Sequence, residues 1–277
     1  MFRAFSLILT AILVCCQFGN QSAAQPKDKA LKMLAAKGWG TLKGTVTYDG
    51  DPPPLKDLRK IIAGNKEWNF FKTSPEKDLL DPTWVINKKN KGVANVVVWL
   101  KPPAGTFFKI PLNDKNRTDT VVLDRPFCAY RPHVLTLFPR YFDGSKWHKT
   151  GQVFKLVNSA PINHCPRLVA DGVTNRNWIL ILKPKSEKVL ELYPQETPIP
   201  CSCTFYNWLS AYIWVFDHPY SAVTNEDGQF VIPRVPAGAE VRVMAWHEDL
   251  GYVLGGKDGK KIAFENEVKQ MNFQIKK

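Results

Sequence analysis

The sequence of 277 residues lacks the signatures of the common enzyme classes. It contains no Gly-x-Ser-x-Gly nucleophile elbow, no phosphate-binding glycine loop, no His-Glu-x-x-His zinc motif and no closely spaced carboxylate pair with a supporting base. The acidic pairs at 226–227 and 248–249 fall at expected turns, where carboxylates are ordinarily solvated. These absences favour a non-enzymatic protein, with a redox carrier as the remaining exception.

Acidic residues are also scarce, because 25 Asp and Glu stand against 38 Lys and Arg, and the formal net charge is +13. The basic residues are spread along the chain and build neither a dense basic helix nor a nucleic-acid-binding motif. We therefore expect no nucleic-acid partner. A solvated basic surface of this kind suits acidic polymers or anionic membranes.

Long apolar runs are absent except near the N-terminus, at residues 5–14. This run follows Arg3 and precedes a stretch of small residues, which is the layout of a signal peptide over 1–24. A membrane-spanning helix needs about 20 apolar residues, and this run has roughly half of them. We therefore predict a secreted or periplasmic protein without a transmembrane segment. A lipid anchor at Cys15 or Cys16 is not expected, because the usual small residue does not precede the first cysteine.

Short runs rich in Val, Ile, Tyr and Trp make up most of the remaining chain. Five Asp-Gly pairs, which suit tight turns, separate these runs. Helix is expected only at 27–37 and in a shorter turn that ends near Gly64. The pattern predicts an all-β protein, either a sandwich or an open barrel. Strands are predicted at 45–48, 93–100, 134–138, 153–157, 178–182, 211–216, 230–232, 241–246 and 272–275.

The C-terminal part of the chain carries a recognisable strand-and-turn pattern. Residues 224–238 contain a turn, an alternating strand around Phe230 and Ile232, and a second turn, and the strand at 241–246 follows. This segment resembles the small transthyretin-like β-sandwich module that is also the regulatory domain of carboxypeptidases. The run 44–50 is similar to the opening strand of such a module. The resemblance implies a structural or binding module with no chemistry of its own.

Five sequence blocks between these ends carry a second resemblance. In chain order they are 95–100 (NVVVWL), 128–134 (CAYRPHV), 158–164 (NSAPINH), 211–220 (AYIWVFDHPY) and 246–248 (WHE). Together they resemble the exported bacterial cupredoxin-like proteins often labelled methylamine utilization proteins. The resemblance implies a cupredoxin-like Greek-key sandwich over 93–216 and a transthyretin-like module over 217–277. Residues 25–92 would supply a helix, a first strand and a proline-rich linker.

The same resemblance implies a mononuclear copper site, built from an upstream histidine and a later Cys-x-x-His-x-x-Met loop. A thiolate, two imidazoles and a weak axial thioether suit a copper ion that shuttles one electron. In this chain, His164 and Cys203 stand at the first two positions, whereas Tyr206 and Leu209 replace the second histidine and the methionine. An axial leucine chiefly changes the redox potential, but a phenol with a pKa of about 10 is a poor substitute for imidazole. We therefore expect no cofactor, with copper as the alternative.

Four cysteines remain after removal of the signal peptide: Cys128, Cys165, Cys201 and Cys203. In an oxidising compartment they can pair in three ways, and the sequence leaves the choice open. On one strand, Cys201 and Cys203 would face the same side roughly 6.5 Å apart, so that each pairs more easily with Cys165 or Cys128 than with the other. Alternatively, Cys165, Cys201, Cys203 and His164 form a set of soft ligands for Zn or Cu(I).

The other histidines carry weaker signals. His133, His218 and His247 recur in the resembled family, but a single histidine at the end of a strand is usually only hydrogen-bonded. His148 lies in segment 139–150, which looks like an insertion relative to the family, and we expect a surface loop with no assigned role there.

Three hypotheses follow. The first is an exported, non-enzymatic β-sandwich protein with a degenerate cupredoxin site and a binding or scaffold role towards a protein or polysaccharide. The second is a copper-binding or electron-transfer protein that uses a modified site around His164 and Cys203. The third is recognition of carbohydrate or an acidic polymer by a basic surface rich in aromatic residues, which make up 12% of the chain.

Overall fold

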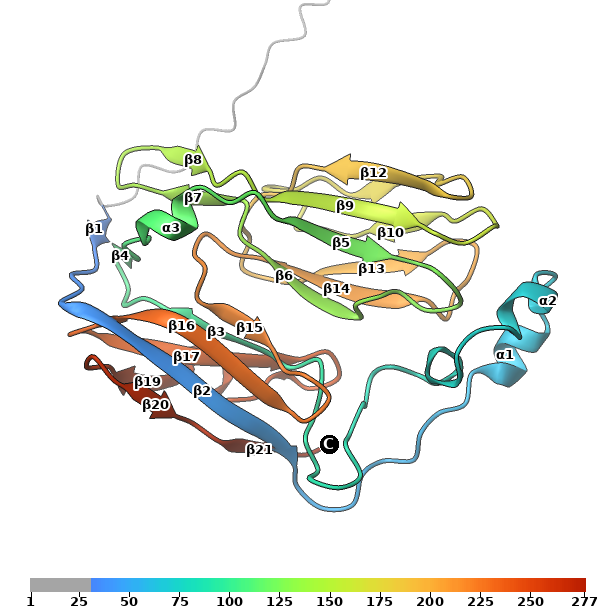
Figure 1. Ribbon diagram of the computed structural model, residues 1–277, viewed down its shortest axis with the longest axis horizontal. Helices are drawn as coiled ribbons and strands as arrows, with labels where there is room; N and C mark the ends of the chain where they lie inside the picture. Colours follow the sequence, from blue (N-terminus) through green and yellow to red (C-terminus); the bar gives the residue numbers. More distant parts are fainter. Residues whose placement is uncertain (1–30) are drawn as a thin grey trace, which may run out of the picture.

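Two β-sandwiches make up most of residues 31–277, the part of the chain that the computed structural model describes (Figure 1). We call them the terminal and the central sandwich. The chain builds part of the terminal sandwich first, passes through the central sandwich, and then returns to complete the terminal one. The predicted signal peptide lies outside the described residues. Within residues 31–277, no helix is both long enough and apolar enough to cross a membrane.

The terminal sandwich encloses a core between two sheets. One sheet has the order β15-β3-β17-β18, with β19 also paired to β17, and in the other sheet β2 lies between β16 and the consecutive strands β20 and β21. Buried and exposed residues alternate along β2, as expected of a strand with one face in the core. The strands are β2 (Gly38–Tyr48), β3 (Val97–Lys101), β15 (Ser221–Val223), β16 (Gln229–Ala237), β17 (Glu240–His247), β18 (Gly251–Tyr252), β19 (Lys260–Ala263), β20 (Val268–Gln270) and β21 (Phe273–Ile275).

The central sandwich also has two sheets, with the orders β11-β10-β13-β14-β6 and β12-β9-β5. Its core is rich in leucine and contains Cys128, Cys201 and Cys203. The strands are β5 (Thr120–Asp124), β6 (Val134–Leu137), β9 (Val153–Asn158), β10 (Pro166–Leu168), β11 (Trp178–Ile179), β12 (Ser186–Leu190), β13 (Ile199–Cys203) and β14 (Ser210–Val215).

Short elements connect and cover the sandwiches. The connection from β2 to β3 packs Ile62 and Phe71 into the central core. It contains α1, whose C-cap residue is Gly64, close to the predicted end of the turn. The elements outside the sandwich sheets are α1 (Arg59–Ala63), α2 (Trp68–Phe71), α3 (Leu112–Lys115), the 3-10 helices η1 (Glu76–Leu79) and η2 (Gly256–Asp258), and the strands β1 (Lys32–Met33), β4 (Thr106–Phe107), β7 (Arg140–Phe142) and β8 (Trp147–Lys149).

A third cluster of apolar side chains joins the two sandwiches. It contains Trp99 of β3, Trp246 of β17 and Trp214 of β14. Four other apolar residues complete it: Val97, Val134, Phe216 and Met244. The ring centroids of Trp99 and Trp214 are 4.7 Å apart. Strands β3 and β17 therefore bury both faces, one in the terminal core and one against the central sandwich. This explains why their sequences are almost continuously apolar.

The all-β sandwich prediction is confirmed, and a strand overlaps each of the nine predicted positions. The helix predicted at 27–37 is wrong for residues 31–37, where β1 pairs in parallel with β4. Backbone hydrogen bonds from Lys32 to Gly105 and from Leu34 to Phe107 hold this stretch extended, and Leu34 is buried in the terminal core. Tertiary pairing thus overrides the helical spacing, while residues 27–30 lie outside the described part.

Two other predicted features differ in detail. The expected surface loop at 139–150 contains the antiparallel hairpin β7–β8. The sheets also group the strands differently from the ranges 25–92, 93–216 and 217–277, because β2 pairs with β16 and β3 pairs with β17. The terminal sandwich consequently draws strands from all three ranges.

Candidate functional site

His164 and Cys203 lie together inside the central sandwich. The extended chain that leads from His164 into β10 pairs with β13, which ends at Cys203. The Nδ1 atom of His164 is 3.2 Å from the Cys203 Sγ atom, and both side chains are buried. The structure thus brings together the two residues that stand at the ligand positions implied by the family resemblance.

Hydrogen bonds engage both ring nitrogens of His164. Its Nε2 atom is 2.9 Å from the Tyr130 hydroxyl oxygen, and that hydroxyl donates to the Ser202 carbonyl at 3.0 Å. The Tyr130 oxygen is therefore left to accept from Nε2–H, so Nδ1 accepts from the Cys203 thiol. This assignment forms one continuous chain of neutral donors and acceptors.

Tyr206 and Leu209 do not supply further ligands to this pair. Both side chains belong to the central core. The Tyr206 hydroxyl donates to the Asn163 carbonyl at 3.3 Å, and its ring packs edge-on against Phe71 at 5.2 Å. The loop after Cys203 therefore closes the end of the sandwich with aromatic packing.

Arg125, which the sequence analysis did not identify, is buried beside this cluster with 0% exposure. Its guanidinium donates to the Phe127 carbonyl at 2.9 Å, the Asn158 side-chain oxygen at 3.1 Å and the Ile162 carbonyl at 3.3 Å. The guanidinium carbon lies 5.4 Å from the centroid of the Tyr206 ring. Among the described residues, no carboxylate forms an ion pair with Arg125. The centre therefore contains a permanent positive charge held by neutral acceptors.

Burial keeps the other groups of this cluster uncharged. Burial, together with the nearby Arg125 guanidinium, lowers the pKa of His164 to about 3. Burial raises the pKa of Cys203, raises that of Cys201 to about 12, and raises the pKa of Tyr130. At neutral pH, the cluster consists of a neutral imidazole, two thiols and a phenol next to one buried cation.

All four cysteines of the described residues are buried and free. The disulfides that the sequence allows therefore stay predictions. Within residues 31–277, no three His, Cys, Asp or Glu side chains are placed to hold one metal ion. The soft-ligand set of His164, Cys165, Cys201 and Cys203 is accordingly not assembled as a site.

The remaining histidines are hydrogen-bonded to, or stacked on, neighbouring groups. His133, next to β6, bonds to the Glu248 carboxylate next to β17, and so links the two sandwiches. His247 stacks on Trp84 with ring centroids 4.1 Å apart. His218 is buried and stacks against aromatic neighbours. His148 lies within 2.5 Å of the Asp143 carboxylate in the β7–β8 hairpin.

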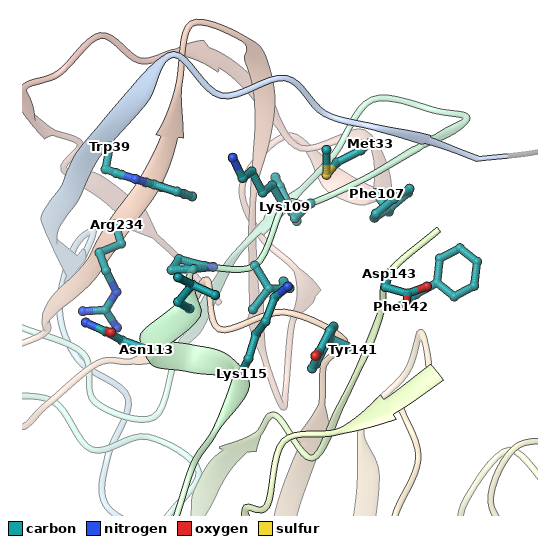
Figure 2. A pocket seen from close by; sticks show the side chains of 14 residues that line it. Met33, Trp39, Phe107, Lys109, Asn113, Lys115, Tyr141, Phe142, Asp143 and Arg234 are labelled. Atoms are coloured by element: carbon teal, nitrogen blue, oxygen red, sulfur yellow. The ribbon is translucent and has the colours of Figure 1, made fainter. Parts of the chain in front are cut away.

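A pocket of about 470 Å³, which we call the basic pocket, opens beside β4, α3 and the β7–β8 hairpin. In the view of Figure 2, Trp39 and Arg234 lie on one side and Tyr141 on the other, with Lys109 and Lys115 between them. A second pocket of about 640 Å³, the aromatic pocket, is lined by residues of both sandwiches, including the three tryptophans Trp99, Trp147 and Trp214. Sequence reasoning did not find either pocket, because the walls come from distant parts of the chain.

The two pockets adjoin each other. Phe107, Phe108 and Phe142 line both of them, so the pockets share a wall, and we call the adjoining pair the groove. Phe107 belongs to β4 and Phe142 to the hairpin insertion. The volume of each pocket is within the range of about 300–1,000 Å³ that is typical of ligand sites.

No family model and no curated protein match this sequence. Similar solved structures include an amicyanin from Paracoccus versutus, with 11% identity over 39% of this chain and 85% of amicyanin and a TM-score of 0.27. A purple cupredoxin from Nitrosopumilus maritimus has 11% identity over 35% of this chain and 98% of its own, with a TM-score of 0.25. A copper-containing nitrite reductase from Thermus scotoductus has 11% identity over 35% of this chain and 22% of its own, with a TM-score of 0.28. Likeness at this level assigns no activity to this chain.

Proposed function

We propose that this chain is an exported, non-enzymatic binding protein in which a closed hydrogen-bonded cluster takes the place of a cupredoxin copper centre. The observation that carries the proposal is the state of His164, both of whose ring nitrogens are engaged, one by the Cys203 thiol and one by the Tyr130 hydroxyl. The five ordered sequence blocks support the relationship to exported cupredoxin-like proteins. The terminal sandwich corresponds to the transthyretin-like part of the same proposal.

The donor set does not fit a cupredoxin copper ion. Such an ion needs two imidazoles and a thiolate in a trigonal arrangement. Here one imidazole and one thiol are in contact, and Tyr206, which stands at the sequence position of the second histidine, donates its hydroxyl to the Asn163 carbonyl. Leu209, which stands at the sequence position of the methionine, is an apolar side chain in the central core and would offer no ligand atom. The buried guanidinium of Arg125 adds a positive charge that opposes any bound cation.

The cluster has a structural role instead. Arg125 ties together the chain at residue 127 and the turn that leads from Asn158 to Ile162. The Asn158 amide in turn donates to three carbonyls, including that of Leu182 at 3.1 Å. These bonds give partners to the two terminal nitrogens of Arg125 and to the Asn158 side chain, whereas the buried Nε atom of Arg125 has no partner among the described residues.

Metal analysis of the mature, exported protein tests the proposal. The protein is incubated with Cu(II), Cu(I) or Zn(II) and desalted, and its metal content is measured beside that of a Cys203→Ser variant. We expect no stoichiometric metal in either protein. A stoichiometric metal that disappears in the variant would overturn the proposal. Thiols counted under denaturing conditions decide separately between four free cysteines and the predicted disulfides, and the intact mass of the protein shows whether it begins after residue 24.

The binding role requires a surface that is shaped for a ligand. The groove formed by the basic and aromatic pockets supplies one, and it lies apart from the closed cluster because the pockets share no lining residue with it. The β7–β8 hairpin, an insertion relative to the resembled family, forms part of its wall through Tyr141 and Phe142. The proposed ligand-binding surface therefore depends in part on a segment that the resembled family lacks.

A further inference from the structure

Two lysines give the basic pocket an excess of positive charge. Lys109 and Lys115 both line it, and neither forms an ion pair with any described carboxylate. The Lys115 ammonium lies 5.4 Å from the centroid of the Tyr141 ring, which keeps it beside the pocket wall. Two unpaired ammonium groups in one concave site attract an anionic group.

The carboxylates near the pocket are already engaged elsewhere. Asp114 is buried and accepts two bonds from Arg234, at 3.0 Å and 2.7 Å. Asp143 accepts backbone N–H groups at the tip of the hairpin and pairs with the ring of His148. Neither carboxylate forms an ion pair with Lys109 or Lys115, and with Arg234 also in the lining the basic pocket keeps a net positive charge that favours an anionic ligand.

Exposed aromatic rings flank this charge along the groove. Trp39, in the basic pocket, is 38% exposed, and Trp147, in the aromatic pocket, is 40% exposed. A single exposed apolar side chain is ordinary, but here the two indole rings stand in adjoining concave pockets that also contain Phe107 and Phe142, where a ligand would contact them. A flat indole face accommodates the apolar C–H face of a sugar ring, while the ring hydroxyls stay in contact with water.

The two adjoining pockets, of about 470 Å³ and 640 Å³, together have room for more than one sugar unit. Trp39 lines only the basic pocket and Trp147 only the aromatic pocket, while Phe107 and Phe142 line both. The aromatic pocket carries charges of both signs, Lys101 and Lys257 with Glu196 and Asp217. Only the basic pocket therefore selects for an anion, and the remaining groove suits neighbouring uncharged parts of a chain.

We propose that this groove binds an acidic polysaccharide. A carboxylate or sulfate group of the polymer lies near Lys109 and Lys115, and adjacent sugar rings pack against Trp39 and Trp147. This inference rests on the proposed binding function, which it deepens by naming the ligand class, and it is independent of whether the central cluster holds a metal.

Calorimetric titration of the mature protein tests the inference. The probes are hexagalacturonate for carboxylates and a heparin-derived hexasaccharide for sulfates, with maltohexaose as the uncharged control. Poly-glutamate and vesicles containing phosphatidylserine represent an acidic peptide and an anionic membrane. We expect at least one acidic oligosaccharide to bind about tenfold or more tightly than maltohexaose, poly-glutamate or the vesicles, with affinity falling as salt is added.

Variants locate the site. The double change Lys109→Gln and Lys115→Gln should weaken binding about tenfold and flatten its salt dependence, because two charge contacts are lost. The matched control is Lys60→Gln with Lys188→Gln, two exposed lysines that line neither pocket and form no ion pair among the described residues. Trp39→Ala should weaken binding by a similar factor that persists at high salt.

For the aromatic change, Phe205→Ala is the control, because Phe205 is an exposed ring outside the groove. Unfolding temperatures confirm that each variant is folded. The inference is overturned if no acidic oligosaccharide binds, if poly-glutamate or the vesicles bind as well as the oligosaccharides, or if the groove variants behave like their controls. None of these results depends on the metal content, so failure of the polysaccharide proposal can be told apart from failure of the proposal about the closed cluster.

Discussion

The buried guanidinium of Arg125 should decide whether the central sandwich can be converted into a copper site. The double change Tyr206→His and Leu209→Met adds the missing imidazole and thioether to the existing pair of His164 and Cys203, which are 3.2 Å apart. Arg125 remains in this variant, with its charge 5.4 Å from the ring at position 206. We therefore expect the double variant to bind Cu(II), but weakly.

The size of the effect follows from the charges and their separation. If an ion held by the imidazole at position 206 lies about 5 Å from the guanidinium, two unit positive charges repel each other by about 3 kcal/mol at an effective dielectric constant of about 20. That energy corresponds to roughly a 100-fold change in dissociation constant. Adding Arg125→Met to the double variant removes the charge and keeps an unbranched apolar side chain of similar length. The triple variant should then bind Cu(II) about 100-fold more tightly than the double variant.

Titration with Cu(II) under anaerobic conditions measures this difference through the thiolate-to-copper charge-transfer band. Arg176→Met in the double variant is the matched control, because Arg176 is exposed and stacks on Trp178 away from the cluster. Arg125→Met also leaves the Phe127 carbonyl and the Asn158 side-chain oxygen without their donor, so the unfolding free energy of each variant is measured in parallel. A folded triple variant with no higher copper affinity than the double variant would refute the role assigned to the Arg125 charge.

Two further outcomes concern stability. Burial lowers the pKa of both His218 and His247, and an unfolded histidine binds its proton near pH 6.5, so the unfolded chain binds more protons below that pH. The free energy of unfolding should therefore fall on acidification below about pH 6.5, by up to about 1.4 kcal/mol per pH unit for each histidine. Urea unfolding at several pH values should show a shallower dependence of this free energy on pH in a His218→Gln, His247→Gln variant. An unchanged pH dependence in the variant would contradict this prediction. Gly44→Ala should destabilise the protein by about 3 kcal/mol, because the added Cβ would meet a backbone carbonyl oxygen at 1.9 Å. Gly64→Ala should instead stabilise it by about 0.5 kcal/mol, because φ is −74° and the nearest atom is 3.8 Å away; equal effects of the two changes in thermal unfolding would refute this reading.

The positions of the strands could be predicted because they depend on local patterns. The alternation in β2 and the turn residues beside β16 appear in any short window of the sequence. Local patterns fail for the stretch 31–37, because its leucine spacing suits a helix whereas its backbone pairs with residues 105–107. A partner about 70 residues away leaves no trace in the local pattern.

The partition of the strands between the two sandwiches could not be predicted for a related reason. The run 96–100 is apolar on both faces because Val98 and Leu100 face the terminal core while Val97 and Trp99 face the other sandwich. A sequence window records only that all these positions are apolar. It therefore cannot tell a central strand of one domain from a strand that lies between two domains.

The central cluster likewise contains residues that the sequence could identify and one that it could not. The family resemblance singles out His164 and Cys203, and the structure places them in contact. Arg125 carries no sequence signal, because an isolated arginine is ordinarily exposed and its acceptors at 127, 158 and 162 are two carbonyls and an amide. The charge that most affects this centre is thus supplied by a residue that no ligand motif contains.

The groove depends on the contact between the sandwiches as much as on its own walls. Its aromatic pocket takes residues from both sandwiches, so its shape is set by how one lies against the other. The packing of Trp99, Trp214 and Trp246 and the bond between His133 and Glu248 fix that arrangement. His133 and Glu248 come from the sequence blocks 128–134 and 246–248, two of the five blocks that resemble cupredoxin-like proteins. In this chain, those blocks hold the two sandwiches together and so maintain a surface that lies apart from the copper position.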